Sequence, residues 1–356
     1  MILHPLTRVL LYVPAKLYEL GVRTRIALYQ GSYLQPARLK GAVISIGNLT
    51  VGGTGKTPLV AFLARYLQDE GHHVAILSRG YRRTSRGVIE VSDGDSIQSN
   101  PAESGDEPFL LARSCPGVRV VVGKQRALAG AWLEERATVS VFLLDDGYQH
   151  LALDRDLNIV LIDASDPRGG GAMMPFGTLR EPLTSLRRAD AVIVTRSDHM
   201  FDQNAMKTLI ATYCRAEVPI FYGYHDVTAL QRLDEAGRIN PIALSRRRVA
   251  VMSGIGRPGR FRADLEHFGM NVVFAREFED HHRYSEEEVA EVIRGAQAAG
   301  AEALVMTEKD MVNLPAEGIA GGDLPIYAAE IEFRCEEEAA LKALTLRVAT
   351  KTPPRP

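Results

Sequence analysis

The chain has 356 residues, of which 46% are hydrophobic and 24% are charged, and its net charge at pH 7 is −2. This length exceeds one ordinary core, so we expect two domains, and the near-neutral charge argues against the broad basic face of a nucleic-acid binder. The three widely spaced cysteines suit a reducing compartment, because they form neither a disulfide framework nor a zinc site: Cys115, Cys214 and Cys335.

Residues 1–40 combine an apolar stripe with positive charge. The apolar run Val9–Ala15 is too short for a membrane span of ~20 residues or for a signal peptide. Apolar residues nevertheless recur at helical spacing: Leu6, Val9, Leu10, Val13, Leu17 and Leu20. Such a stripe is typical of a helix in a membrane interface and also of one packed on the protein's own core, and the residues alone favour the second. Pro14 interrupts the stripe.

From residue 41 onwards, short apolar strands alternate with helices. The expected helix runs from Pro58 to Glu70, and the expected strands are Ala42–Ile46, His73–Leu77, Val118–Val122, Val139–Leu144, Ile159–Ile162 and Ala191–Val194. Continuous apolar strands that alternate with helices indicate a parallel sheet covered on both faces. We therefore predict an α/β core over residues 41–220.

A second, smaller α/β domain is expected over residues 249–340. Its strands are Val249–Met252, Asn271–Phe274 and Ala303–Met306, and its helices are Phe261–Phe268 and Ser285–Ala298. Residues 221–248 would link the two domains. Residues 341–356 would form a C-terminal tail whose last part, Thr352–Pro356, is frayed.

A phosphate-binding loop lies between the first strand and the first helix of the core. Its residues are Thr50, Val51, Gly52, Gly53, Thr54, Gly55, Lys56 and Thr57. The glycines let backbone N–H groups close around phosphate oxygens, Lys56 reaches the β and γ phosphates, and the Thr57 hydroxyl binds Mg²⁺. A strict G-x-x-x-x-G-K-[ST] search would miss this loop, because Thr50 stands where the first glycine belongs. The predicted fold is thus a P-loop NTPase-type parallel sheet.

The apolar strand Val141–Leu144 ends in Asp145 and Asp146. A P-loop fold presents a carboxylate to the magnesium shell in this way, and the sequence leaves open which aspartate does so. A phosphotransferase also needs a base and cations for the transition-state charge. The candidates lie in loops, where each taken singly would read as a turn residue or a solvated side chain: Asp106, Asp280, His281 and His282 for the base, and Arg79, Arg126 and Arg180 for the cations.

Two further motifs suggest other functions. Ser253–Gly259 contains a formal G-x-G-x-x-G, with Glu277 and Glu279 about where a dinucleotide-binding acid belongs, although a lone motif of this kind is weak. Thr195–Asp198 resembles the [NT]KxD guanine reader, which would fit a membrane-associated GTPase switch, but Asp145–Gly147 has the wrong spacing for a DxxG switch. A soluble kinase of a small sugar or nucleoside would leave the amphipathic N-terminus unexplained.

Seven motifs in this order resemble the tetraacyldisaccharide 4′-kinase family of the lipid A pathway, over about residues 5 to 340. They are Gly47–Pro58 (GNLTVGGTGKTP), Ser78–Tyr81 (SRGY), Gly105–Pro108 (GDEP), Asp145–His150 (DDGYQH), Leu179–Pro182 (LREP), Asp280–His282 (DHH) and Thr307–Asp310 (TEKD). The family's own phosphate loop also lacks the first glycine.

This resemblance implies transfer of the γ-phosphate of ATP, with Mg²⁺, to the 4′-hydroxyl of tetraacyldisaccharide 1-phosphate, giving lipid IVA. It implies Asp106 as the general base and His281 rather than His282 as its partner. It implies that Lys56, Thr57, Asp145 and Asp146 hold ATP and Mg²⁺. The implied substrate-cleft residues are Arg79, Tyr81, Arg126, His150, Arg180 and Glu181.

The implied partners are the glycolipid substrate and a membrane surface, with no nucleic acid and no protein partner. The implied location is the cytoplasmic face of the bacterial inner membrane, peripheral or anchored through the N-terminus. The resemblance therefore favours the interfacial interpretation of the N-terminal helix, and leaves open whether that helix spans the bilayer or lies on it.

Overall fold

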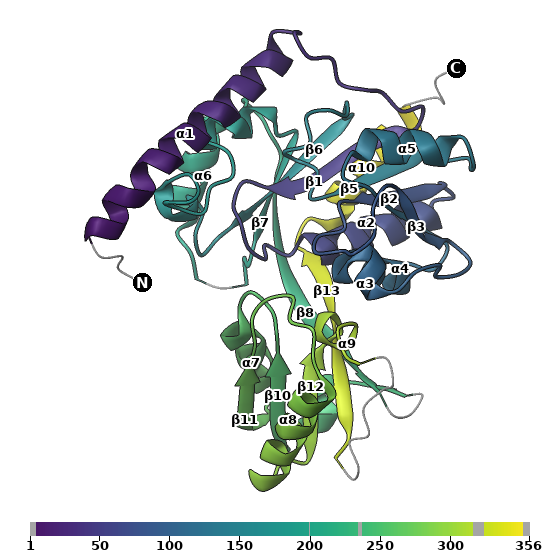
Figure 1. Ribbon diagram of the computed structural model, residues 1–356, viewed down its shortest axis with the longest axis vertical. Helices are drawn as coiled ribbons and strands as arrows, with labels where there is room; N and C mark the ends of the chain where they lie inside the picture. Colours follow the sequence, from purple (N-terminus) through teal and green to yellow (C-terminus); the bar gives the residue numbers. More distant parts are fainter. Residues whose placement is uncertain (1–4, 199, 234–236, 316–323, 352–356) are drawn as a thin grey trace.

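The computed structural model describes residues 5–198, 200–233, 237–315 and 324–351, which form two lobes joined through one sheet (Figure 1). The segment 352–356, expected to fray, lies outside the described residues. Within them the sheet has 13 strands, in the order β11-β10-β12-β13-β8-β7-β6-β1-β5-β2-β4-β3, with β9 paired to β8.

The larger lobe confirms the predicted parallel α/β core. β1 (Ala42–Asn48) lies between β5 (Val141–Asp145) and β6 (Leu157–Asp163), parallel to both, and all seven of its residues are buried. The remaining strands of this lobe are β2 (Val74–Ser78), β3 (Ile89–Asp93), β4 (Arg119–Val122) and β7 (Ala191–Thr195), of which only β3 runs antiparallel to its neighbour. Burial on both faces explains why these strands are apolar throughout.

Successive side chains of a strand point to opposite faces of the sheet, so the core of this lobe has two layers. Ile44 and Ile46 of β1 pack in the layer that contains α2 (Lys56–Asp69), whereas Val43 faces the layer of α5 (Arg126–Glu134). This lobe also contains α3 (Pro101–Ser104), α4 (Asp106–Ser114) and α6 (Gln203–Tyr213). Because β1, β5, β6 and β7 are parallel, their carboxyl ends lie at the same edge of the sheet, where parallel folds bind ligands.

The smaller lobe is a parallel sheet with helices on its faces. It consists of β10 (Arg248–Ser253), β11 (Asn271–Glu277) and β12 (Ala303–Thr307), with α7 (Pro258–His267), α8 (Glu286–Ala298) and α9 (Glu308–Met311). α8 begins with a capping box between Ser285 and Glu288, and three glutamates lie in its first turn. These contacts satisfy free N–H groups and complement the helix dipole.

The segment between the lobes, expected as a linker over residues 221–248, is built on a long strand. β8 (Ile220–Arg232) first pairs in parallel with β7 and then runs antiparallel to β13 (Ile326–Cys335). β9 (Arg238–Ile239) and a short 3-10 helix, Pro241–Leu244, follow it. The polar and aromatic residues of β8 hid this strand from a search for continuous apolar runs. β13 then returns to the larger lobe, where α10 (Glu338–Lys351) packs against α2.

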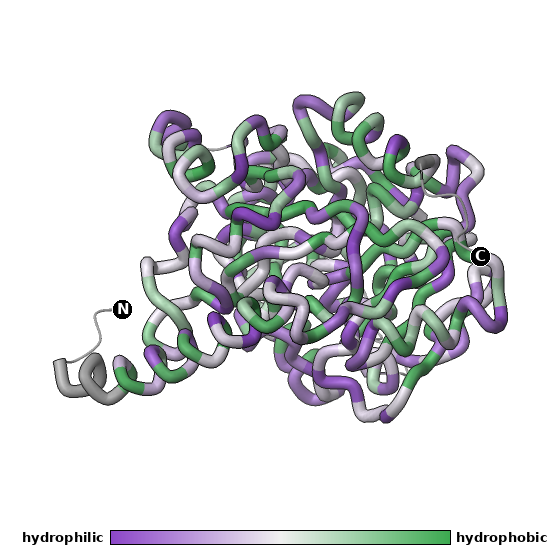
Figure 2. Tube along the Cα trace, turned by 90° about the horizontal axis from the view of Figure 1, so that it is seen from above, coloured by the Kyte–Doolittle hydropathy of each residue, from purple (hydrophilic) through white to green (hydrophobic). Residues whose placement is uncertain are grey.

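The N-terminal helix α1 (Pro5–Gln30) continues through Pro14 and projects from the body of the larger lobe (Figure 2). Ala15 is buried and Val22 packs against the core beside α6. The side chains of Val13, Leu17 and Leu20 are 60%, 65% and 63% exposed. The helix thus packs on the protein through one face and leaves Val13, Leu17 and Leu20 of the predicted apolar stripe uncovered. Among the described residues, no helix is long and apolar enough to cross a membrane.

The ribbon of β8 and β13 is fixed to the larger lobe by Phe333. Its ring lies 5.6 Å from that of Phe62, and it occupies the space that a side chain at Gly223 would need. Because Phe333 is 2% exposed, Phe333→Ala should lower the free energy of unfolding by about 3 to 5 kcal/mol. Chemical denaturation measures this change, with Tyr33→Ala, at an 81% exposed site, as control. Similar losses in both variants would contradict the anchoring role.

Candidate active site

The phosphate loop runs from the end of β1 to the start of α2, with an open apex. Gly52 and Gly55 have φ of +102° and +81°, which only glycine adopts without strain. Val51, Gly52 and Gly53 are exposed, and no atom lies within 4 Å of a Cβ built on Gly52 or Gly53. Thr57 lies in the first turn of α2. Backbone N–H groups and the helix N-terminus are thus placed around a space suited to phosphates.

Neighbouring segments close the base of this loop. Val51 N–H donates to the Thr178 carbonyl at 2.8 Å, and Thr50 forms a bridge with Leu179. The hydroxyl of Thr54 is buried and has no hydrogen-bond partner among the described residues. A buried hydroxyl of this kind needs a partner, so it is a donor available to a bound oxyanion.

His225, which the sequence analysis did not single out, lies beneath the loop. Its Nε2 is 3.2 Å from the Gly55 carbonyl, and a Cβ on Gly55 would come within 1.9 Å of the imidazole ring. Burial lowers the pKa of His225 to about 4, so the ring is neutral at pH 7. Gly55 is therefore required both for its positive φ and for the space that His225 fills. No motif signals this residue, because β8 brings it here from 170 positions away.

Asp146 lies at the centre of a charged network. The Arg180 guanidinium donates to both of its carboxylate oxygens, at 2.6 and 2.8 Å, and Lys56 Nζ lies 3.6 Å away. Lys56 also donates to Asn48 at 3.2 Å. Burial alone would raise the pKa of Asp146, but Lys56 and Arg180 hold it well below its ordinary value. The lysine of the loop, Asp146 at the end of β5 and the predicted Arg180 thus lie together.

Asp145 has the opposite environment. It is 2% exposed, accepts a hydrogen bond from the Ser78 hydroxyl at 3.0 Å, and leaves its Oδ1 without a partner. Burial, followed by the charges of Glu107 and Asp146, raises the pKa of Asp145 to about 7. The two adjacent carboxyl groups therefore have pKa values shifted in opposite directions, because burial dominates at Asp145 and the cations dominate at Asp146.

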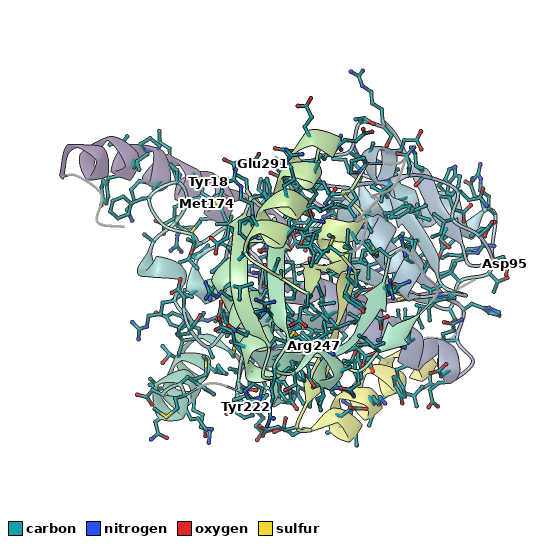
Figure 3. All side chains as sticks on the ribbon, turned by 90° about the horizontal axis from the view of Figure 1, so that it is seen from below. Tyr18, Asp95, Met174, Tyr222, Arg247 and Glu291 are labelled. Carbon is teal, nitrogen blue, oxygen red and sulfur yellow. The ribbon has the colours of Figure 1, made fainter. Side chains whose placement is uncertain are left out.

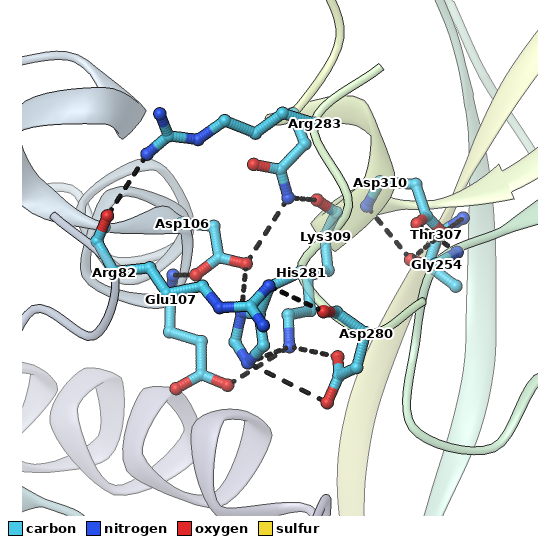
Figure 4. Close-up of polar contacts among 12 residues, drawn as sticks. Arg82, Asp106, Glu107, Gly254, Asp280, His281, Arg283, Thr307, Lys309 and Asp310 are labelled. Atoms are coloured by element: carbon cyan, nitrogen blue, oxygen red, sulfur yellow. Dashed lines mark hydrogen bonds and ion pairs between the residues drawn. The ribbon is translucent and has the colours of Figure 1, made fainter. Parts of the chain in front are cut away.

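Asp106 and His281 meet across the two lobes (Figure 4). Asp106 begins α4, His281 lies in the loop after β11, and His281 Nδ1 is 2.6 Å from Asp106 Oδ2. Burial would raise the pKa of Asp106, but the hydrogen bond with His281 and the charge of Lys309 hold it below its ordinary value. His282 turns away and pairs with Glu288 at 3.1 Å. Of the two histidines, only His281 contacts the predicted base.

Lys309, in the predicted TEKD motif but without an expected role, organises this cluster. Its Nζ lies 3.3 Å from Glu107, 3.0 Å from Asp280 and 3.3 Å from His281 Nε2. Asn313 adds a hydrogen bond to Asp106 at 3.3 Å. The lobes are thus held together by polar contacts around one carboxylate.

Arg79 and Arg126, the other two predicted cations, also lie near Asp146. Arg126 is 6% exposed, and burial lowers its pKa to about 10 although Asp146 opposes this shift. Burial and then the charge of Arg126 lower the pKa of His150 to about 3, and its Nε2 has no partner. Arg79 and Arg25 act on the pKa of both groups. Arg25, from α1, is a neighbour that sequence spacing could not supply.

The remaining predicted substrate residues occupy separate positions. Tyr81 is 55% exposed, and its ring lies 5.3 Å from the His281 ring. It therefore lies beside the pair formed by Asp106 and His281. Glu181 is buried and bound to Arg188 at 2.5 Å, so its carboxylate is committed to an internal pair. Tyr18 of α1 donates to the Arg180 carbonyl at 3.1 Å and is labelled at the base of the helix in Figure 3.

The glycine-rich turn after β10 is closed by the protein itself. Gly254 N–H donates to Asp310 at 2.7 Å, and a Cβ on Gly254 would lie 2.8 Å from the Tyr284 hydroxyl. The Asp310 carboxylate, which also accepts from the Thr307 and Tyr284 hydroxyls, thus takes up the Gly254 N–H that a bound phosphate would need. This packing argues against the dinucleotide interpretation of Ser253–Gly259.

Comparisons with known proteins give one result over nearly the whole chain. The family model described as tetraacyldisaccharide-1-P 4′-kinase matches residues 7–349. A tetraacyldisaccharide 4′-kinase of Syntrophus aciditrophicus is 42% identical, covering 95% of this chain and 92% of that protein. One of Geobacter sulfurreducens is 44% identical, covering 94% and 91%. The crystal structure of LpxK from Aquifex aeolicus in complex with ATP is 34% identical, with a TM-score of 0.77, covering 96% and 99%.

The raised pKa of Asp145 predicts a pH-dependent stability. The folded protein keeps this proton up to about pH 7, whereas the ordinary pKa is 3.8, so stability falls as pH rises between these values. Asp145→Asn cannot ionise and should therefore raise the melting temperature more at pH 8 than at pH 5. Thermal unfolding without nucleotide or Mg²⁺ checks this, with the exposed Asp95→Asn as control. An equal effect of Asp145→Asn at both pH values would contradict the assignment.

Proposed function

The chain belongs to the tetraacyldisaccharide-1-P 4′-kinase family, and on that premise we propose how its residues carry out the reaction. The protein is an ATP-dependent kinase of lipid A biosynthesis that phosphorylates the 4′ position of a tetraacyldisaccharide precursor. The observation that carries the proposal is the contact between Asp106 and His281 at 2.6 Å, near the end of β5, where the charge of the adjacent Glu107 acts on Asp145.

The phosphate loop would bind the triphosphate of ATP. Lys56 is held near the end of β5 by Asn48 and Asp146, which supports its placement beside the β and γ phosphates. Thr54 would donate its unpartnered hydroxyl to a phosphate oxygen. Arg180 and Arg126 would offset the charge that develops on the transferred group.

Mg²⁺ would be held by Thr57, Asp145 and Asp146 together with phosphate oxygens. Their oxygen ligands suit this hard cation, and the buried Oδ1 of Asp145 has no partner without one. Among the described residues no three His, Cys, Asp or Glu side chains could hold a metal by themselves, so the nucleotide would complete the ligand set. When bound, the ion neutralises phosphate charge.

Asp106 would accept the proton of the attacking 4′-hydroxyl. Its pKa lies below the ordinary value, so it is ionised at pH 7 and ready to accept. Lys309 can only donate hydrogen bonds, so its contact with His281 Nε2 favours a neutral imidazole with a lone pair on that nitrogen. His281 Nδ1–H would then donate to Asp106 and orient it.

The acceptor would lie between this pair and the cations beneath α1. Tyr81 borders His281, and Arg25, Arg79 and Arg126 would attract the 1-phosphate of the disaccharide. His150 would contribute a neutral imidazole with a free Nε2. Glu181 would act on the cleft only through Arg188.

The exposed stripe of α1 would lie in the surface of the membrane that holds the lipid substrate. Val13, Leu17 and Leu20 share one face of the helix, and Lys16 and Arg23 flank it with exposed positive charge. An apolar stripe with flanking bases is typical of an interfacial helix. We place this surface at the cytoplasmic face of the inner membrane, where ATP is available.

Substitutions at Asp106 and at His281 should lower kcat by different amounts. Asp106→Ala should slow transfer from ATP to tetraacyldisaccharide 1-phosphate by roughly 10² to 10⁴. His281→Ala should cause a smaller fall in kcat, whereas His282→Ala, whose partner is Glu288, should keep a near-normal kcat. Radiolabel transfer in mixed micelles measures all three. Equal kcat values for the two histidine variants would contradict the role of His281 as the partner of Asp106.

The interfacial role of α1 predicts a loss of membrane binding without loss of fold. Leu17→Glu with Leu20→Glu should reduce co-sedimentation with anionic phospholipid vesicles, because two charges replace exposed apolar groups. The matched control is Leu128→Glu, at a 58% exposed position on α5. Unchanged co-sedimentation of the double variant with vesicles would favour an α1 that only packs on the protein's own core.

A further inference from the structure

An apolar loop, residues 169–179, lies between the phosphate loop and α1. Its sequence is GGGAMMPFGTL, so it contains no charged residue. Met173 and Leu179 are buried in the same apolar cluster, whereas Met174 and Phe176 are partly exposed. The reaction scheme proposed above gives this loop no role, although it contacts two elements that the scheme uses.

The base of this loop is bonded to the phosphate loop. Val51 N–H donates to the Thr178 carbonyl at 2.8 Å, and Thr50 forms a bridge with Leu179. A Cβ on Gly169 would come within 2.5 Å of the Thr50 methyl group, so the two segments pack closely. A displacement of the apolar loop would therefore move the first two residues of the phosphate loop.

α1 holds the same loop from the other side. The Phe176 ring lies 6.3 Å from the Tyr12 ring in an edge-to-face arrangement. The Tyr18 hydroxyl donates to the carbonyl of Arg180, the residue that follows the loop, at 3.1 Å. Val22 packs against the apolar cluster that includes the buried part of the loop. The position of the loop thus depends on the position of α1.

Hydrogen bonds inside the loop make it one unit. Gly177 N–H donates to the Met173 carbonyl at 2.9 Å, and Met174 N–H donates to the Leu179 carbonyl at 2.9 Å. A Cβ on Gly177 would lie 2.2 Å from the Ala172 carbonyl oxygen, so only glycine permits this closure. The loop can therefore pass a displacement from its contacts with α1 to its contacts with the phosphate loop.

The phosphate loop would bind phosphates more tightly if it were held in place beforehand. Gly52 and Gly53 at its apex are exposed, and no described atom lies within 4 Å of a Cβ built on either. Glycine loses more backbone entropy than any other residue when it is ordered, so a contact that orders the loop in advance raises its affinity. Val13, Leu17 and Leu20 of α1 are exposed in water. A bilayer that covered them would hold this helix along a second face.

We propose that loop 169–179 couples the lipid contact of α1 to the phosphate loop, so that the protein binds nucleotide more tightly on a membrane than in water. Phe176 and Tyr18 are positioning residues in this assignment, because they act on the nucleotide only through the phosphate loop and Arg180. The proposal rests on the function proposed above, which supplies the lipid surface and the nucleotide. Its consequence is that ATP is bound chiefly where the lipid acceptor is present.

The first test compares nucleotide affinity with and without lipid. The full chain is titrated calorimetrically with ADP and Mg²⁺, in buffer and on vesicles of phosphatidylcholine and phosphatidylglycerol, which contain no acceptor. The wild type should bind ADP at least about fivefold more tightly on vesicles, the lower end of the usual coupling between two sites. Because coupling is reciprocal, ADP should raise the affinity for the vesicles by the same factor, which co-sedimentation measures.

The second test removes the contacts between α1 and the loop. Phe176→Ala combined with Tyr18→Phe should remove most of the gain on vesicles, while co-sedimentation and the ADP affinity in buffer stay near wild-type values. Phe176→Tyr keeps the ring and should retain the gain. The matched control is Leu128→Ala combined with Tyr33→Phe, at positions that are 58% and 81% exposed. Should the double variant fail to fold, Tyr12→Leu, at a 52% exposed position, removes the ring contact from α1 and should also lower the gain.

These measurements separate the coupling from the function on which it rests. Equal ADP affinity of the wild type with and without vesicles, in a protein that co-sediments with them, would overturn the coupling and leave the kinase assignment intact. A full gain in the double variant, or an equal loss of ADP affinity in buffer and on vesicles, would overturn the role of the loop. Failure of the wild type to co-sediment would overturn the lipid contact of α1, and undiminished ADP binding to Lys56→Ala would overturn the nucleotide role of the phosphate loop.

Discussion

The hydrogen bond between Asp106 and His281 is the contact on which the rest of the molecule depends, because its two ends belong to different lobes. Asp106 has a fixed position at the start of α4, and His281 reaches it only when the ribbon of β8 and β13 holds the smaller lobe in place. The same ribbon carries His225 beneath the phosphate loop. The position of the proposed base and the shape of the nucleotide loop therefore have a common support.

Opposite environments give neighbouring acids different chemistry at this edge. Asp146 is held ionised by Lys56 and Arg180, whereas burial raises the pKa of Asp145 to about 7. Asp106 lies between these cases: it is buried, yet the hydrogen bond with His281 and then the charge of Lys309 keep its pKa low. The pKa of each carboxyl group at this edge thus depends on whether burial or its polar neighbours dominate, and those neighbours come from different segments of the chain.

The sequence predicts the parts of this arrangement that are local. β1, β5 and the phosphate loop follow from apolar runs and glycines, since burial on both faces leaves a continuous signature. β8 was missed because its residues alternate between buried and partly exposed positions, as Phe221 and Tyr222 do, and so form no continuous apolar run. The contacts of His225, Lys309 and Arg25 could not be predicted, since each depends on a fold that joins distant positions. Their residue types alone are those of ordinary surface side chains.

In the proposed function, α1 would connect the lipid surface with the reaction site through its two faces. The face with Leu17 and Leu20 is exposed, and the other carries Tyr18 to the Arg180 carbonyl and Arg25 towards Arg126. Burying the apolar stripe in a bilayer would therefore set the height of the cations above the membrane. A disaccharide held in the same bilayer by its acyl chains would meet those cations without leaving the lipid. The helix would thus orient the cleft as well as attach the protein, which explains why it is rigidly packed at one end and uncovered along the other face.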